Sequence, residues 1–163
     1  MPATYEPIAT TTLGSAAASI TFSSIASSWT DLRLVLVGGV SVSGAYNYLQ
    51  FNSDTASNYS TTRLDGDGSS PASARTTSAT FARLATSLDT NPNLFEIDVF
   101  SYAGSTNKTF LCGTSADQNG SGRVTRTVGL WRSTSAITSV AITMSSGNFN
   151  TGTTATLYGI KNA

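Results

Sequence analysis

The chain has 163 residues, with nine Lys or Arg against nine Asp or Glu and therefore no net formal charge. This length favours a single domain, which buries roughly two thirds of the surface of its unfolded chain and needs neither disulfides nor a metal to fold. The neutral charge argues against binding duplex nucleic acid, and the absence of a run of about 18 apolar residues argues against a membrane span.

Composition indicates a folded, β-rich domain rather than a disordered linker. Charged residues make up only 11% of the chain, while Ser and Thr supply about three residues in ten. A hydrophobic content of 39%, with fifteen aromatic residues, is too high for a disordered chain. Glu and Lys, which favour helix surfaces, occur only twice each. The opening MPATYEPIAT lacks a basic region followed by an apolar core, so we expect no export signal.

Short segments rich in alternating apolar residues predict strands along the whole chain. In chain order these segments are 19–24, 31–39, 46–52, 59–66, 77–87, 94–103, 107–116, 123–132, 137–144 and 155–161. Turn residues separate them at intervals of about ten residues, which is typical of an antiparallel sandwich, a jelly roll or a barrel.

The segment DLRLVLVGG (31–39) is the predicted central strand. Leu32, Leu34 and Leu36 lie on one face, and the valines make the other face apolar as well. YNYLQFN (46–52) follows an SVSG turn, so we predict that these two strands form a hairpin.

Four other segments have individual patterns. DGDGSSPAS (65–73) is predicted to be a loop from its Asp-Gly pairs and proline. TSATFARLATS (77–87) has some apolar residues at helical spacing, but its Ser and Thr content favours a strand. In LFEIDVFSYA (94–103), the residues predicted to face inward are Phe95, Ile97 and Val99. In RVTRTVGLWR (123–132), the residues predicted to share a face are Val124, Val128 and Leu130.

The absence of histidine removes Ser-His-Asp and Cys-His nucleophile systems and most zinc sites. Cys112 lies on a predicted strand and is expected to be a small buried hydrophobe rather than a reactive thiol. Glu96 and Asp98 lie two apart on one strand face, which is compatible with a glycosidase carboxylate pair. The simpler interpretation is cross-strand pairing with arginines. The candidate partners are Arg123, Arg126 and Arg132.

Metal and glycan sites have weak signals. Asp65 and Asp67 in DGDG offer two carboxylates to calcium, but the closing Glu of an EF-hand is missing and Asp-Gly pairs favour turns. Sequons begin at Asn58, Asn107 and Asn119, and we expect them to be unmodified because no secretion signal is visible. We therefore expect no metal and no cofactor.

Aromatic residues are the remaining candidates for ligand binding. Their faces suit sugar stacking and their polar tips suit hydrogen bonding, although core packing is the more common role. The candidates are Trp29, Tyr46, Tyr48, Tyr59, Tyr102, Trp131 and Tyr158.

Four stretches carry a resemblance that spans nearly the whole chain. They are TTLGSAAASITFSSI (11–25), DLRLVLVG (31–38), YLQFNSDTASNYS (48–60) and VGLWRSTSAITSVAITMSSGNFNTGTTATLYGI (128–160). Together they resemble small proteins encoded in the virion-structure region of tailed phages, notably cyanophages, and domains of phage tail fibres. The resemblance implies a jelly-roll-like subunit on the capsid exterior, often a trimer, that cements neighbouring major capsid subunits. No catalytic residue is carried over with it.

We accordingly interpret the fold as all-β: an antiparallel, jelly-roll-like β-sandwich of about nine or ten strands. Residues 1–22 are expected to form an N-terminal arm plus the first strand, and residues 23–163 a single β-sandwich domain. The arm is expected to reach onto a neighbour. The residues expected to contact a partner are Tyr5, Pro7, Ile8, Trp29 and Trp131.

The expected function is structural and not enzymatic: a capsid decoration protein, made in the host cytoplasm, that binds the major capsid protein as a homotrimer on the virion exterior. The alternative is a tail-fibre or head-fibre adhesion domain that binds host polysaccharide, and a glycan hydrolase using Glu96 and Asp98 is a distant third. Neither nucleic acid nor membrane is an expected partner. The stretch FNSDTASNYS (51–60) is interpreted as a turn whose backbone is capped by its own Asn and Asp side chains.

Overall fold

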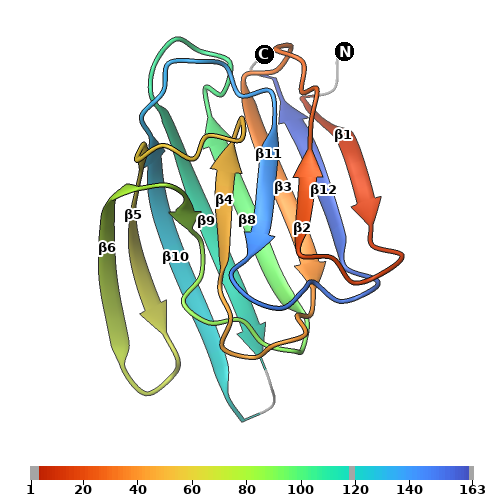
Figure 1. The fold of residues 1–163 in the computed structure, drawn as a ribbon, viewed down its shortest axis with the longest axis vertical. Helices are drawn as coiled ribbons and strands as arrows, with labels where there is room; N and C mark the ends of the chain where they lie inside the picture. Colours follow the sequence, from red (N-terminus) through yellow and green to blue (C-terminus); the bar gives the residue numbers. More distant parts are fainter. Residues whose placement is uncertain (1–3, 118–119, 162–163) are drawn as a thin grey trace.

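The structure is a computed structural model that describes residues 4–117 and 120–161. Twelve strands run antiparallel within two sheets over these residues, and the smaller sheet lies across one face of the larger (Figure 1). The all-β, jelly-roll-like sandwich predicted from the alternating segments is therefore confirmed, with twelve strands rather than nine or ten in the described part.

The larger sheet contains eight strands. In spatial order they are β1 (Tyr5–Thr12), β12 (Thr154–Ile160), β3 (Asp31–Gly38), β8 (Asn93–Phe100), β9 (Lys108–Asp117), β10 (Gly122–Trp131), β5 (Tyr59–Gly66) and β6 (Pro71–Ala79). The smaller sheet contains β2 (Ser19–Phe22), β11 (Val140–Met144), β4 (Asn47–Phe51) and β7 (Ala82–Arg83), in that order. At one side the β5–β6 hairpin extends past the smaller sheet (Figure 1).

The core forms where the apolar faces of the two sheets meet. Leu32, Leu34 and Leu36 of β3 are all buried, as are the inward residues of β8. Alternation places every second residue of a strand on one face, so each strand contributes one apolar row to the core. The predicted inward residues of β8 and the central position of β3, between β12 and β8, are confirmed.

The predicted hairpin from 31–39 to 46–52 is wrong. β3 pairs with β12 and β8 in the larger sheet, whereas β4 pairs with β11 and β7 in the smaller sheet. The intervening loop crosses from one sheet to the other, and Val40 within it forms a bridge to Phe149. Proximity in sequence favours pairing, but the apolar faces of both strands are better buried when they face each other across the core.

The predicted loop at 65–73 and strand at 77–87 are both corrected. β5 continues to Gly66, a short turn follows, and β6 already begins at Pro71. β6 ends at Ala79, and only the two residues of β7 are strand in the second half of 77–87. The sequence pattern missed β6 because it lacks the large apolar residues that mark a buried strand.

In β10, Val124, Val128 and Leu130 do share a face, as predicted, but it is the face turned away from the core. The inward residues of β10 include Thr125, Thr127 and Trp131. An apolar row therefore lies outside, which becomes important for the functional surface.

The N-terminal residues belong to the two sheets over the described part of the segment 1–22. β1 pairs along its length with β12 at the edge of the larger sheet, and β2 pairs with β11 at the edge of the smaller sheet. The described residues also contain no helix long and apolar enough to cross a membrane.

Candidate functional site

The candidate site is the outer sheet face, defined as the side of the eight-stranded sheet that points away from the smaller sheet. Large apolar side chains are exposed on it. They include Val37, Leu64, Leu94, Phe100, Val124 and Val128, with Tyr5 at the β1 edge. Leu64 and Val124 are the most exposed of these, at 63% each. Contiguous exposed apolar surface commonly marks an interaction site, whereas single exposed apolar residues do not.

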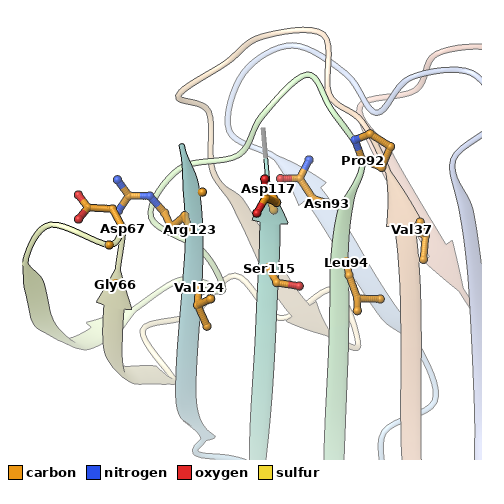
Figure 2. A pocket seen from close by; sticks show the side chains of 13 residues that line it. Val37, Gly66, Asp67, Pro92, Asn93, Leu94, Ser115, Asp117, Arg123 and Val124 are labelled. Atoms are coloured by element: carbon orange, nitrogen blue, oxygen red, sulfur yellow. The ribbon is translucent and has the colours of Figure 1, made fainter. Parts of the chain in front are cut away.

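One row of cross-strand neighbours forms a hollow on this face. Val37 pairs with Leu94, Leu94 with Ser115, Ser115 with Val124, and Val124 with Gly66, so the row crosses five strands. The small residues Ser115 and Gly66 keep the floor low between larger apolar neighbours, and the hollow measures about 770 Å³. Figure 2 shows the labelled side chains of this row on adjacent strands.

Charged side chains lie at the rim of the hollow. Arg123 and Asp67 lie side by side in Figure 2. The carboxylate of Asp67 accepts hydrogen bonds from the Oγ and backbone N of Ser69 and from the backbone N of Ser70, and these hydrogen bonds hold its pKa well below the usual range. Asp67 thus closes the β5–β6 turn.

The two carboxylates considered as a candidate calcium pair do not come together. Asp65 faces inward on β5, where it accepts hydrogen bonds from the hydroxyls of Thr86 and Thr125, while Asp67 lies in the exposed turn. Within residues 4–117 and 120–161, no group of three Asp, Glu, Cys or His side chains is placed to hold a metal ion.

The two carboxylates of β8, Asp98 and Glu96, have different neighbours in the sheet. Asp98 forms a two-pronged ion pair with Arg33 of β3, at 2.6 Å from Nε to Oδ1 and 2.9 Å from Nη2 to Oδ2. The hydrogen bond to Asp98 raises the pKa of Arg33, which keeps the pair charged. A cross-strand arginine was predicted, but Arg33 is the partner rather than Arg123, Arg126 or Arg132. Glu96 faces outward two residues before Asp98 on the same strand, opposite Val35.

The five predicted partner contacts fall in different environments. Tyr5 is exposed at the β1 edge and stacks on Tyr158 with ring centroids 4.6 Å apart, and Pro7 is exposed beside the same tyrosine. Ile8 packs partly against the core. Trp29 is half-buried and its ring covers Gly159. Trp131 is only 2% exposed and belongs to the core, so its prediction as a surface contact is wrong.

The candidate aromatic platform does not form as one surface. Tyr59, Tyr102 and Trp131 are buried in the core, and Tyr158 lies on the outer sheet face. Tyr46 and Tyr48 are half-exposed on the far side of the molecule. There the Tyr48 ring contacts Phe81, with centroids 4.5 Å apart, and the Arg83 guanidinium lies 4.0 Å from the Tyr46 ring centre.

Cys112 and the sequons also have structural environments. Cys112 is fully buried, and that burial raises the pKa of its thiol to about 12, so it stays protonated and unreactive near neutral pH. Asn58 donates a hydrogen bond from its side chain to Asp54, whereas Asn107 is exposed. Asn119 lies outside the described residues.

The stretch 51–60 is a turn held by its own Asn and Asp side chains, as interpreted from sequence. The carboxylate of Asp54 accepts hydrogen bonds from Ala56 N at 2.8 Å, Asn58 Nδ2 at 2.8 Å and Trp131 Nε1 at 2.6 Å. Asn52 accepts from the backbone of Thr138 and Ser139 and donates to Ala136. The polar side chains of this stretch therefore fasten the turn to the 132–139 loop and to the core tryptophan.

Sequence reasoning missed the residues that make the outer sheet face. Leu64 was placed in a predicted strand without an assigned face, and Val124 was assigned only to a face shared with Val128 and Leu130. The available signal was in β10 itself, where threonines alternate with valines and leave the direction of the core undecided.

Comparison with known proteins provides no template for this surface: no protein-family model, no curated protein and no solved structure matches the chain.

Proposed function

We propose that this protein is a virion structural protein of a tailed phage, which binds the outer capsid surface and stabilises it. The observation that carries the proposal is the outer sheet face, a broad, regular surface on which exposed apolar side chains such as Val124 and Val128 surround a hollow and alternate with a few charged ones. Such a surface suits docking onto another folded protein. The likeness of the sequence to phage structural proteins supplies the kind of partner.

The physical demands on a capsid cement agree with this fold. A cement protein has to be rigid and to gain affinity from many identical contacts, each of which buries a modest area. The strands are joined by turns whose polar side chains are used internally, as Asp54 and Asn52 are. Identical copies commonly assemble with closed cyclic symmetry, so we propose a homotrimer that contacts the major capsid protein.

Several side chains of the types used in catalysis are engaged in structural interactions. Asp98 is paired with Arg33, Asp65 binds two hydroxyls, and Cys112 is buried. This arrangement favours a docking protein over the hydrolase alternative built on Glu96 and Asp98.

A virion-binding experiment tests the proposal. Labelled antibody on intact virions, viewed by electron microscopy, should mark the head. Purified protein should bind capsids that lack it, and Val124→Asp or Val128→Asp should weaken binding about tenfold or more by placing an unpaired charge in the contact. Thr143→Asp on the outward side of β11 is the matched control and should bind normally. Label on the tail, or unchanged binding by both valine variants, would contradict the proposal.

The β1 edge is the second part of the proposed contact. Tyr5 and Pro7 are exposed where β1 continues the outer sheet face. Deleting residues 2–12 should therefore weaken capsid binding, and retained full affinity would remove this edge from the contact.

An adhesion domain for host polysaccharide is the alternative, and one observation favours it. Tyr46, Tyr48 and Phe81 gather beside Arg83 on the smaller-sheet side, with faces that remain half-exposed. Aromatic faces of this kind stack on sugars. Saturable binding on a glycan array that is lost in Tyr48→Ala would support this alternative over the capsid proposal.

A further inference from the structure

The last strand of the larger sheet, β6, has an unusually open edge. It pairs only with β5, and its residues 71–78 are all exposed. Arg75 is its single charged residue, and its only proline, Pro71, is at the very start. A long edge strand with little charge, no interior proline and no covering loop is a template for pairing with another strand.

The opposite edge of the same sheet is protected. β1 carries Pro7 in its interior, Glu6 beside it, and a register shift between Pro7 and Ala9. On β6 the corresponding irregularity lies at the far end, near Ser78 with its φ of 51°, so residues 71–76 stay regular. The sheet therefore has one blocked edge and one open edge.

An unpaired arginine lies one strand in from the open edge. Arg63 of β5 is only 6% exposed, and its Nε and Nη1 have no hydrogen-bond partner among the described residues. Leaving such donors buried without an acceptor costs free energy, and more when the group is charged. Arg63 pairs in register with Thr127 on one side and with Ala74 of β6 on the other.

One inward carboxylate lies near two guanidinium groups here. Burial lowers the pKa of Arg83, the nearby charge of Arg63 lowers it further, and the charge of Asp65 offsets part of this. Asp65 lies two residues from Arg63 on β5, and its Oδ1 accepts hydrogen bonds from the hydroxyls of Thr86 and Thr125. A further carboxylate would satisfy both the free donors and the excess positive charge.

We propose that the β6 edge binds an extended segment of a partner protein that carries an Asp or Glu facing Arg63 across Ala74. Neighbouring strands lie about 4.8 Å apart, so a strand added beside β6 places its inward side chain roughly 10 Å from the β5 backbone, within the combined reach of Arg and Glu. The residue between Arg63 and the added strand is Ala74, whose side chain is a single methyl group. A second β6 strand would not serve, because β6 holds no acidic residue.

A carboxylate built into the chain tests the charge requirement. Ala74→Glu should satisfy Arg63 internally and raise Tm by about 2–4 °C, as expected for roughly 1 kcal/mol in a domain of this size. Ala74→Gln should leave Tm unchanged, because it adds no negative charge. Ala72→Glu should lower Tm, because residue 72 lies opposite Asp65 and the two carboxylates would repel each other. Equal effects of Ala74→Glu and Ala72→Glu would overturn the assignment of Arg63.

A displayed library of random extended peptides tests docking directly. Selection on the wild-type protein should enrich β-forming peptides with one Asp or Glu at a fixed position, and the synthesised peptide should slow amide exchange within 71–76. Affinity should fall at least about tenfold in Arg63→Met and in Ala74→Glu, with folding of each variant confirmed by its cooperative melt. Selected peptides without an acidic position, full binding by both variants, or concentration-dependent self-association through β6 would overturn the proposal.

Discussion

At the scale of single residues, Asp54 shows how a polar turn residue is used to fasten two parts of the fold. Burial by itself would raise its pKa, but hydrogen bonds from Asn58, Trp131 and Ala56 outweigh burial and leave the pKa below its ordinary value. The charged form is therefore the one the folded state prefers.

The first prediction concerns this carboxylate. Asp54→Asn should lower the free energy of unfolding by about 1–3 kcal/mol at pH 7, because it weakens charge-assisted hydrogen bonds to the turn and to Trp131. Since the folded pKa lies below the unfolded value of about 3.9, the Asp54 contribution is complete above that pH and is lost as pH falls through the folded pKa. Urea unfolding followed by tryptophan fluorescence measures both effects.

The control for Asp54 is Thr55→Ala, an exposed neighbour in the same turn. It should leave both the stability at pH 7 and the acid limb of the stability curve unchanged. An acid limb that is the same in Asp54→Asn and in the wild type would show that other carboxylates are responsible.

The second prediction uses Cys112 as a probe of opening. Because burial raises its thiol pKa to about 12, an aromatic disulfide reagent at pH 8 should label the native protein only through unfolding, with a rate that rises with urea. Rapid, urea-independent labelling would mean that the thiol is reached in the folded state.

At the scale of elements, close packing of β9 against β10 depends on a glycine. A Cβ added at Gly129 would lie 2.0 Å from Cζ of Phe110, which is buried in the core. The ring occupies the space above the glycine, so the two strands and the core share one tight contact.

The third prediction follows from that contact. Gly129→Ala should destabilise the fold by about 1–3 kcal/mol through overpacking, and Phe110→Leu should recover part of the loss when combined with it. Gly14→Ala, where nothing lies within 4 Å of the added Cβ, is the control and should be near neutral. Thermal unfolding measures all three variants, and additive losses in the double variant would contradict the proposed clash.

How far the sequence predicts the elements depends on how strongly each strand is buried. β8 and β3 were predicted well because Phe95, Ile97 and the leucines of β3 alternate with residues that face outward. The pairing of β3 was not predictable from neighbouring turns, since the partner strands β8 and β12 lie far along the chain. β6 was missed because no apolar row marks a strand that has no core to cover.

The candidate site was harder to predict than the fold for a related reason. Alternation indicates which residues share a face, as it did for Val124 and Val128, but it does not indicate which face meets the core. In β10 the threonine row is buried and the valine row is exposed, which reverses the usual assignment. Only the packing of the whole sheet decides this.

At the scale of the whole molecule, stability should fall from the centre of the larger sheet toward β6. β3 and β8 lie between neighbouring strands and below the core, whereas β6 has one neighbour and no covering layer. Both open features, the outer sheet face and the β6 edge, belong to the same eight-stranded sheet, so a partner can engage them from one side without disturbing the core.

The fourth prediction is a gradient of hydrogen exchange that follows this arrangement. Amides of 94–100 should exchange only through global unfolding, because their hydrogen bonds connect strands on both sides of β8, while those of 71–79 should exchange orders of magnitude faster through opening of the β5–β6 hairpin. Exchange followed by mass spectrometry at several urea concentrations separates the two routes, since only global opening has a strong urea dependence. Equal protection of the two segments would mean that β6 is held by something other than its pairing with β5.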